Sequence, residues 1–204
     1  MPSPSQLIPP LIIAGSLLLG ACGGSSSSTT TTASGDATDI TDVSLTARNG
    51  SCADYVGTYE SSVTDVQNSV SFMGDFTISV SGSTCTLASN DIPNHNFNDA
   101  TADFATNVAE VAKSYTMPTS PTAAGSTTEL ALGTTNAILL NGVVLDILPA
   151  ACYGVGDEPL GQEKIGCGGD QIANPWRYDP MSSLNGFGTD IHNAHVQPDG
   201  TYHY

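Results

Sequence analysis

The chain has 204 residues, of which 20 are acidic and only four are Lys or Arg, so its formal net charge is −16 at pH 7. A polyanion repels nucleic-acid phosphates and anionic lipid headgroups, which argues against nucleic acid and acidic membrane surfaces as partners. Hard or borderline metal cations are compatible with this charge.

The N-terminus is typical of an export signal. Residues 7–19 are mostly apolar but contain two prolines, and they are too few to span a bilayer, which takes about 20 apolar residues. The following Leu19-Gly20-Ala21-Cys22 resembles the lipobox of bacterial lipoproteins. That resemblance implies a lipoprotein signal peptide over residues 1–21 and lipidation of Cys22, whose acyl chains would hold the protein to a lipid bilayer. We therefore expect a lipid-anchored protein of the cell envelope, at the outer membrane or another extracytoplasmic face.

A tether and one folded domain are expected after Cys22. Residues 25–32 are all Ser or Thr, and low complexity continues to about residue 47. Such a segment buries too little apolar surface to offset the entropy of ordering it, so residues 22–50 are predicted to be a disordered tether. Residues 51–204 have the length of a single domain with one core.

Four cysteines follow Cys22 and favour disulfides, because the predicted compartment is oxidising. Their order suggests Cys52–Cys85 and Cys152–Cys167, although four cysteines allow three pairings. The alternative is a four-cysteine zinc site, which the absence of any C-x-x-C pair disfavours.

The predicted elements are mostly strands. In chain order they are a hairpin over 76–87, a helix over 99–113, a second hairpin over 137–145 turning at Asn141-Gly142, and a third closed by Pro198-Asp199-Gly200. Residues 153–190 are rich in Gly, Pro and Asp and are expected to form long loops. The fold class is a mostly β, sandwich-like or partly open barrel domain with long loops.

The third hairpin places two histidines together. With a three-residue loop, His195 lies directly opposite His203, and opposed residues of an antiparallel pair have Cβ atoms about 4.5–5.5 Å apart. Imidazole is the commonest metal ligand among side chains, and two imidazoles at this separation can share one ion. The C-terminus is therefore the first candidate for a functional site.

Three segments carry a family resemblance. Residues 190–204, ending in Tyr202-His203-Tyr204, resemble the signature of the YHYH domain family; residues 88–95 and 140–143 are similar to that family's Ser-Asn-x-Ile-Pro-x-His and Leu-Asn-Gly-Val segments. The resemblance covers about residues 75–204. It implies a secreted or envelope protein, often bacterial, and no particular activity.

The family's signature continues to a second histidine, whereas this sequence stops at Tyr204. We therefore expect the domain to be truncated at its C-terminus. On a strand the missing histidine would share a face with His203, because alternate residues point the same way.

The leading functional hypothesis is a zinc or copper site, with His95, His195 and His203 as ligands and Asp190 as a further ligand or as a residue that orients an imidazole. His192 is a weaker candidate, because it would face the other way. The structural alternative is that these histidines hydrogen-bond to loops and pack under Tyr202 and Tyr204.

Two further hypotheses remain open. The first is a metal-dependent hydrolase or copper redox enzyme, with Asp146, Asp170 and Asp190 as bases and Tyr202 as a hydrogen-bond donor. The second is a non-catalytic binding or structural module for glycans or envelope proteins, with residues 174–180 as its contact and the only tryptophan, Trp176, more readily read as a core anchor. No spacing diagnostic of a particular reaction is present, and no oligomeric state is predicted.

Overall fold

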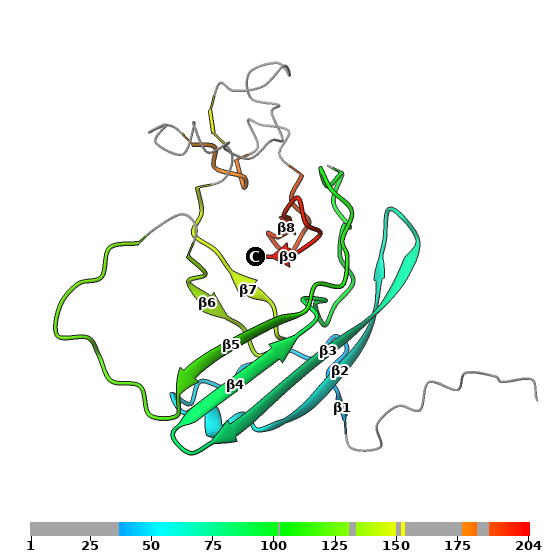
Figure 1. Ribbon diagram of the computed structural model, residues 1–204. Coiled ribbons are helices and arrows are strands. Elements are labelled where there is room, and N and C mark those ends of the chain that lie inside the picture. The colour runs from blue at the N-terminus through cyan, green and yellow to red at the C-terminus, as the bar shows by residue number, and fades with distance from the viewer. Residues whose placement is uncertain (1–36, 102, 131–133, 150–151, 154–176, 183–187) are drawn as a thin grey trace, which may run out of the picture. The chain divides into compact units, whose positions relative to one another are not determined.

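The computed structural model describes residues 37–204 apart from 102, 131–133, 150–151, 154–176 and 183–187 (Figure 1). These residues belong to one compact unit, 33–204. Its described part is mostly β, with two sheets that do not close into a barrel. The prediction of a mostly β domain is therefore confirmed.

The larger sheet has five strands in the order β1-β2-β3-β4-β5. β1 pairs parallel with β2, and the other neighbours are antiparallel. In β2, β3 and β4 buried and exposed residues alternate over much of each strand, as expected when one face of a sheet is covered. The strands are β1 (Thr38–Asp39), β2 (Gly57–Asp65), β3 (Val70–Ser81), β4 (Thr84–Ser89) and β5 (Lys113–Pro118).

The predicted hairpin over 76–87 is confirmed as β3 and β4, which turn at Gly82 with φ of +58°. The short 3-10 helix η1 (Cys52–Tyr55) precedes β2, and Cys52 is joined to Cys85 on β4 by a disulfide. The first predicted disulfide is thereby confirmed.

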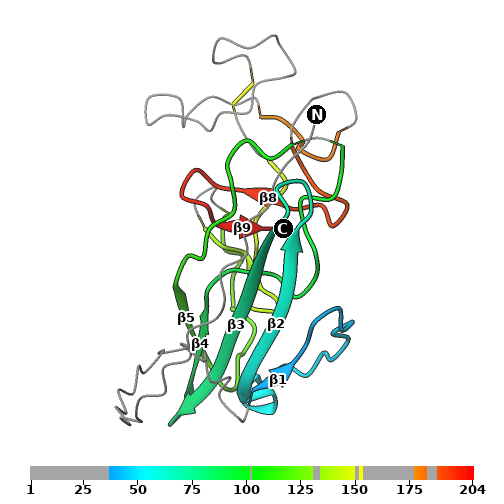
Figure 2. The ribbon, with the colours of Figure 1, turned by 90° about the vertical axis from the view of Figure 1, so that its right-hand side faces the viewer.

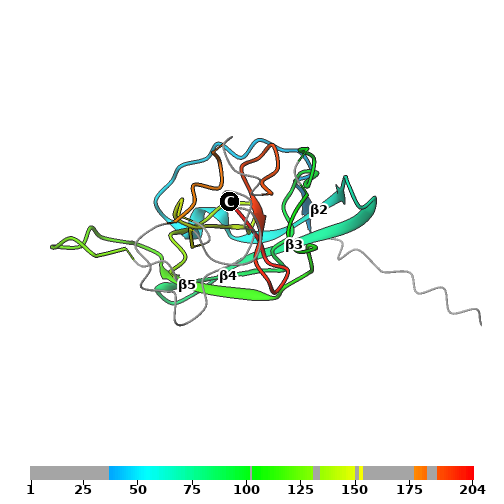
Figure 3. The same cartoon turned by 90° about the horizontal axis from the view of Figure 1, so that it is seen from above.

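The smaller sheet has the order β6-β7-β9-β8. Its strands are β6 (Ala137–Ile138), β7 (Val144–Leu145), β8 (His195–Val196) and β9 (Tyr202–His203). β7 and β9 run parallel, with Val144 opposite His203, so two segments about 60 residues apart in sequence meet here. Figures 2 and 3 show the β8–β9 hairpin beside one face of the larger sheet.

Two buried apolar clusters occupy the inner face of the larger sheet. One lies under the smaller sheet and includes Phe97, Val143 and Tyr202; the other surrounds the Cys52–Cys85 disulfide. The first cluster combines side chains from both sheets and therefore holds the β8–β9 hairpin in place.

The folded part begins earlier than residue 51, which corrects the predicted extent of the tether. Thr38 and Asp39 pair with β2, Ile40 is buried, and the Asn94 side chain donates to the carbonyl oxygens of Ile40 and Val43. Backbone pairing and one buried apolar residue are enough to order a segment of low-complexity composition.

The helix predicted over 99–113 is wrong. The described residues of this stretch are irregular up to β5, although Phe104 and Val108 do pack into the first cluster. Their apolar spacing reflects alternate burial along a segment that lies against the core, and its Thr and Asn residues are weak helix formers.

The hairpin over 137–145 is confirmed, but its loop is one residue longer than predicted. Leu139 N donates to Val143 O, so three residues intervene, and Gly142 takes the left-handed φ of +83°. The longer loop turns the Asn141 side chain inward, where it is buried and hydrogen-bonded.

Cys152 is disulfide-bonded and forms an isolated bridge with Arg177. Cys167, its predicted partner, lies outside the described residues, as do Cys22, Asp170 and Trp176. Within the described part of the chain, no helix has the length and apolar character needed to cross a bilayer.

The close approach of the two sheets at Gly142 gives a first prediction. A Cβ at Gly142 would lie 2.7 Å from Ser89 Oγ and 2.8 Å from the Phe76 ring, whereas a Cβ at Gly82 would meet nothing within 4 Å. Both glycines have positive φ. We expect Gly82→Ala to destabilise the fold by about 1 kcal/mol through backbone strain and Gly142→Ala by about 1–3 kcal/mol more through overpacking. Urea unfolding measures both, and equal costs would contradict the docking of this turn on the larger sheet.

Candidate histidine site

The β8–β9 hairpin has the predicted register. His195 pairs with His203 and Val196 with Tyr202, and Gly200 takes the left-handed position of the three-residue loop with φ of +93°. The His195 and His203 ring centroids are 4.4 Å apart. The prediction that these two imidazoles face each other across neighbouring strands is confirmed.

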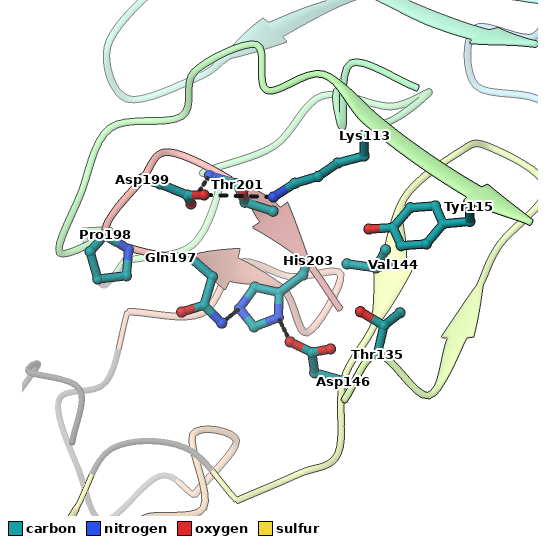
Figure 4. A pocket seen from close by; sticks show the side chains of 10 residues that line it. All are labelled: Lys113, Tyr115, Thr135, Val144, Asp146, Gln197, Pro198, Asp199, Thr201 and His203. Carbon is teal, nitrogen blue, oxygen red and sulfur yellow. Dashed lines mark hydrogen bonds and ion pairs between the residues drawn. The ribbon is translucent and has the colours of Figure 1, made fainter. Parts of the chain in front are cut away.

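His203 is oriented by Asp146, which follows β7. His203 Nδ1 lies 2.9 Å from Asp146 Oδ2, and the Gln197 side-chain nitrogen lies 3.3 Å from His203 Nε2 (Figure 4). The parallel pairing of β7 with β9 brings Asp146 to this position, because its partner strand carries His203. His203 Nδ1 thus faces a carboxylate, and its Nε2 faces the Gln197 side-chain amide.

The environment keeps His195 uncharged. Burial, followed by the neighbouring His203, lowers the pKa of His195 to about 3. At neutral pH this imidazole is therefore unprotonated, which is the form that can bind a metal ion.

A pocket of about 390 Å³ lies beside His203 (Figure 4). The Lys113 ammonium projects into it and lies 3.6 Å from Asp199 Oδ2. Ten residues from both sheets line the pocket: Lys113, Tyr115, Thr135, Val144, Asp146, Gln197, Pro198, Asp199, Thr201 and His203.

His95 and His192 lie together near Tyr202 of β9 and Tyr204, which follows it. Their rings stack with centroids 3.6 Å apart, and His95 packs against Tyr202 and Tyr204. His95 Nδ1 donates to Asn96 O at 2.7 Å, so its Nε2 accepts from the Tyr204 hydroxyl at 2.6 Å. Burial is the main cause that lowers the pKa of His95. Both ring nitrogens of His95 are therefore hydrogen-bonded, as expected if this histidine has a structural role instead of binding a metal ion.

Strand alternation explains this separation of the histidines. Tyr202 and Tyr204 point to one face of β9, and His203 points to the other. His95 joins the tyrosines, while His195 joins His203. The structure thus assembles two histidine pairs, and no cluster of three or more His, Cys, Asp or Glu side chains suited to a metal ion occurs in the described ranges.

Asp190 is occupied by backbone and phenol donors. Its Oδ1 accepts from the amides of His192 and Ala194, and its Oδ2 accepts from the Tyr202 hydroxyl at 2.8 Å. Burial, with the Asp190 charge as a further cause, raises the pKa of Tyr202 well above its usual range. Asp190 therefore shapes the loop before β8 and anchors Tyr202, whereas Asp146 takes the imidazole-orienting role that was predicted for Asp190.

A buried amide network fixes Tyr204. The Asn141 side-chain nitrogen donates to Tyr204 Oη at 2.9 Å and to Asn94 Oδ1 at 3.1 Å. These residues come from the three segments that carry the family resemblance. The three segments of the resemblance therefore meet at a contact between distant parts of the chain.

The aromatic contact segment predicted over 174–180 is described only from Arg177 onward. Tyr178 is buried and packs against Tyr153. Because Tyr178 is packed in the interior, the described part of the segment offers little exposed aromatic surface.

Sequence reasoning missed two residues near the pocket. Lys113 was assigned to a helix, and Asp91 is the variable position of the Ser-Asn-x-Ile-Pro segment. Asp91 is fully buried, and neither of its carboxylate oxygens has a hydrogen-bond partner. Burial raises the pKa of Asp91 to about 7. Only the meeting of β4, β5 and the C-terminal hairpin produces this environment, so no local sequence signal would identify it.

The two perturbed groups have opposite effects on stability. Between about pH 3 and 6.5 the unfolded chain binds a proton at His195 that the folded chain does not, so this group makes stability rise with pH. Between about pH 4 and 7 the folded chain holds the Asp91 proton that the unfolded chain has lost, so this group makes stability fall with pH.

Replacing Asp91 or His195 removes that residue's contribution to the pH dependence of stability, so the two variants should shift the pH profile in opposite directions. From pH 5 to 7.5, the stability of Asp91→Asn relative to the unmodified protein should rise by about 1–2 kcal/mol, a value reduced for solvent screening. The relative stability of His195→Gln should fall. Urea unfolding in EDTA across this range measures both, and parallel pH profiles for all three proteins would contradict the assigned environments.

Comparison with known proteins finds a family match for the C-terminal part of the chain. No curated protein and no solved structure matches the chain. Residues 114–204, which contain all of β5 but its first residue, the β6–β7 hairpin and the β8–β9 hairpin, match the family model described as YHYH protein. The resemblance inferred from the sequence is confirmed over these residues, which contain its central and C-terminal segments, whereas its segment at 88–95 lies outside the match.

Proposed function

We propose that the protein is an envelope-anchored lipoprotein that binds a zinc or copper ion at its C-terminal hairpin. The observation that carries this proposal is the facing pair of His195 and His203, with Asp146 on the Nδ1 of His203. A carboxylate that accepts from one nitrogen of a ligating histidine is the usual arrangement behind metal-bound imidazoles.

Two imidazoles suit a borderline cation and leave coordination positions open. His203 contributes Nε2, and His195 is unprotonated at neutral pH because of its lowered pKa. His95, His192 and Asp190 stay outside this set because the tyrosine face of β9 separates them from His203. Water or a small ligand from the adjacent pocket would occupy the remaining positions, so the site suits reversible binding better than a closed structural zinc site.

The pocket favours metal-dependent hydrolysis as a second candidate. A bound metal ion lowers the pKa of a coordinated water, and the pocket beside His203 is large enough for a small substrate. Lys113 supplies a positive charge on the same pocket wall. The third candidate, a non-catalytic glycan or envelope-protein module, has less support because its predicted contact is only partly described and Tyr178 within it is buried.

Metal binding can be tested by titrating zinc into the metal-depleted protein with isothermal calorimetry and by measuring bound metal. We expect a near-stoichiometric site whose affinity falls by more than tenfold in His195→Ala or His203→Ala, because each change removes a ligand. Asp146→Asn should weaken binding by about 10–100-fold through loss of the orienting carboxylate.

Two matched variants serve as controls. His192→Ala removes a histidine from the tyrosine face, and Asp199→Asn removes a carboxylate from the same pocket that does not contact His203. Both should bind zinc normally. If the controls lose as much affinity as the site variants, or if the unmodified protein retains no metal, the proposal is wrong.

Anchoring is tested by expressing the full chain and Cys22→Ala in a bacterium that processes lipoproteins. We expect the unmodified protein in the membrane fraction with an acylated Cys22 by mass spectrometry, and the variant in soluble form, because the thiol that accepts the lipid is gone. Equal membrane association of the two proteins would contradict lipid anchoring through this residue.

A further inference from the structure

The pocket beside His203 is lined mainly by polar side chains. Of its ten lining residues, only Val144 and Pro198 lack a polar side-chain group. Sites for apolar ligands have the opposite make-up, with mostly apolar walls and a few polar groups that set the orientation of the ligand. The volume of about 390 Å³ lies within the range of small-molecule sites, which is about 300–1,000 Å³. A ligand that fills this pocket therefore has to be small and polar over most of its surface.

One wall of the pocket belongs to the larger sheet and presents hydrogen-bond donors. Lys113 and Tyr115 are alternate residues of β5, so both side chains lie on the same face of the sheet. Figure 4 shows the Lys113 ammonium reaching toward Asp199 and the Tyr115 hydroxyl turned into the pocket. Burial is the main cause that raises the pKa of Tyr115, so this phenol keeps its proton at neutral pH and can donate a hydrogen bond.

The opposite side of the pocket presents acceptors. Asp199, in the loop of the β8–β9 hairpin, accepts from the Thr201 amide at 3.1 Å and lies 3.6 Å from the Lys113 ammonium. Hydrogen bonds from Thr201 are the main cause that lowers the pKa of Asp199, so its carboxylate is charged at neutral pH. Asp146, after β7, adds a second carboxylate, one oxygen of which faces His203 Nδ1. A carboxylate accepts several hydrogen bonds, so both groups can also accept from a ligand.

The charges of the lining favour a neutral ligand. Asp146 and Asp199 outnumber the single ammonium of Lys113, and the chain has a net charge of −16, so an anionic ligand is repelled. A cationic ligand meets the Lys113 ammonium and has to compete with it and with His203 for the two carboxylates. A neutral molecule that both donates and accepts hydrogen bonds can use all of these groups without breaking an ion pair.

Apolar surface accompanies the polar groups. Val144 is buried at the pocket wall, and Tyr115 contributes an aromatic ring as well as its hydroxyl. Tyrosine combines an apolar body with a polar end in this way. Sugars are small neutral molecules with the matching surface, because their hydroxyls donate and accept around the ring edge and their C–H groups pack against apolar and aromatic side chains.

We propose that this pocket binds one neutral sugar residue, as a monosaccharide or at the end of a glycan chain. Lys113 and Tyr115 donate to the sugar hydroxyls, and Asp146 and Asp199 accept from them. The contact lies in the pocket, whereas the sequence had suggested residues 174–180 for glycans. The site needs no metal ion, so it is independent of the proposed zinc binding.

The test uses the full chain, depleted of metal and kept in EDTA at pH 7.5, with saturation-transfer NMR as the readout. The probes are glucose, galactose, mannose and N-acetylglucosamine, with maltose and chitobiose as longer chains. We expect at least one of these to bind with millimolar affinity, the strength usual for so small a ligand. Glucuronate and galacturonate, the anionic controls, should bind at least tenfold more weakly, because the two carboxylates repel them.

Variants of the two walls locate the sugar. Tyr115→Phe and Asp199→Asn should each weaken its binding by about threefold or more, because each removes or weakens a hydrogen bond. Ser114→Ala is the matched control: it removes a hydroxyl from β5 between the two lining residues, on the exposed face, and should bind sugar normally. Tyr115→Phe keeps the ring that packs around the disulfide, so it decides the question if Asp199→Asn fails to fold.

Zinc titrations separate this proposal from the preceding one. His195, which is not among the lining residues, can be replaced by Ala, and this variant should lose zinc and retain sugar. Tyr115→Phe should lose sugar affinity and retain zinc. If no probe binds, if the uronates bind as well as the neutral sugars, or if Tyr115→Phe binds sugar as well as Ser114→Ala, the sugar site is wrong and the zinc site is unaffected.

Discussion

The alternation of side chains along β9 is the constraint on which the functional end of the molecule depends. Tyr202 and Tyr204 point to one face, and His203 points to the other. The tyrosine face is fixed by hydrogen bonds from Tyr202 to Asp190 and from Asn141 to Tyr204. A shift of one residue would place the histidine among the apolar side chains and both tyrosines on the side of Asp146, so these contacts also fix the register that presents His203 to Asp146.

The same strand joins the two sheets. Its parallel pairing with β7 brings in Asp146, and the turn between β6 and β7 is so close to the larger sheet that a Cβ at Gly142 would clash with Ser89 and Phe76. The pocket forms where these elements meet, and its lining comes from β5, β7 and the C-terminal hairpin. Function at this site therefore depends on packing between sheets as much as on the residues of the hairpin itself.

The polar groups around the pocket divide by chemistry. On one side are two imidazole rings and a carboxylate in contact with one of them, which suits a borderline metal ion. On the other side is the buried Asp91 carboxylate, whose oxygens have no hydrogen-bond partner in the described part of the chain. An acidic chain with few basic residues has little internal positive charge with which to compensate such carboxylates.

Local sequence patterns determined the elements whose causes are local. Turn residues with fixed backbone preferences specified the hairpins around Gly82, Gly142 and Gly200, and the hairpin loop set the pairing of His195 with His203. The helix over 99–113 failed because its apolar spacing came from contact with the core. Tertiary structure alone placed His95 with the tyrosines, Asp146 on His203 and Asp91 in a buried position, because these environments arise where segments distant in sequence meet, and hydrophobic periodicity carries no information about such meetings.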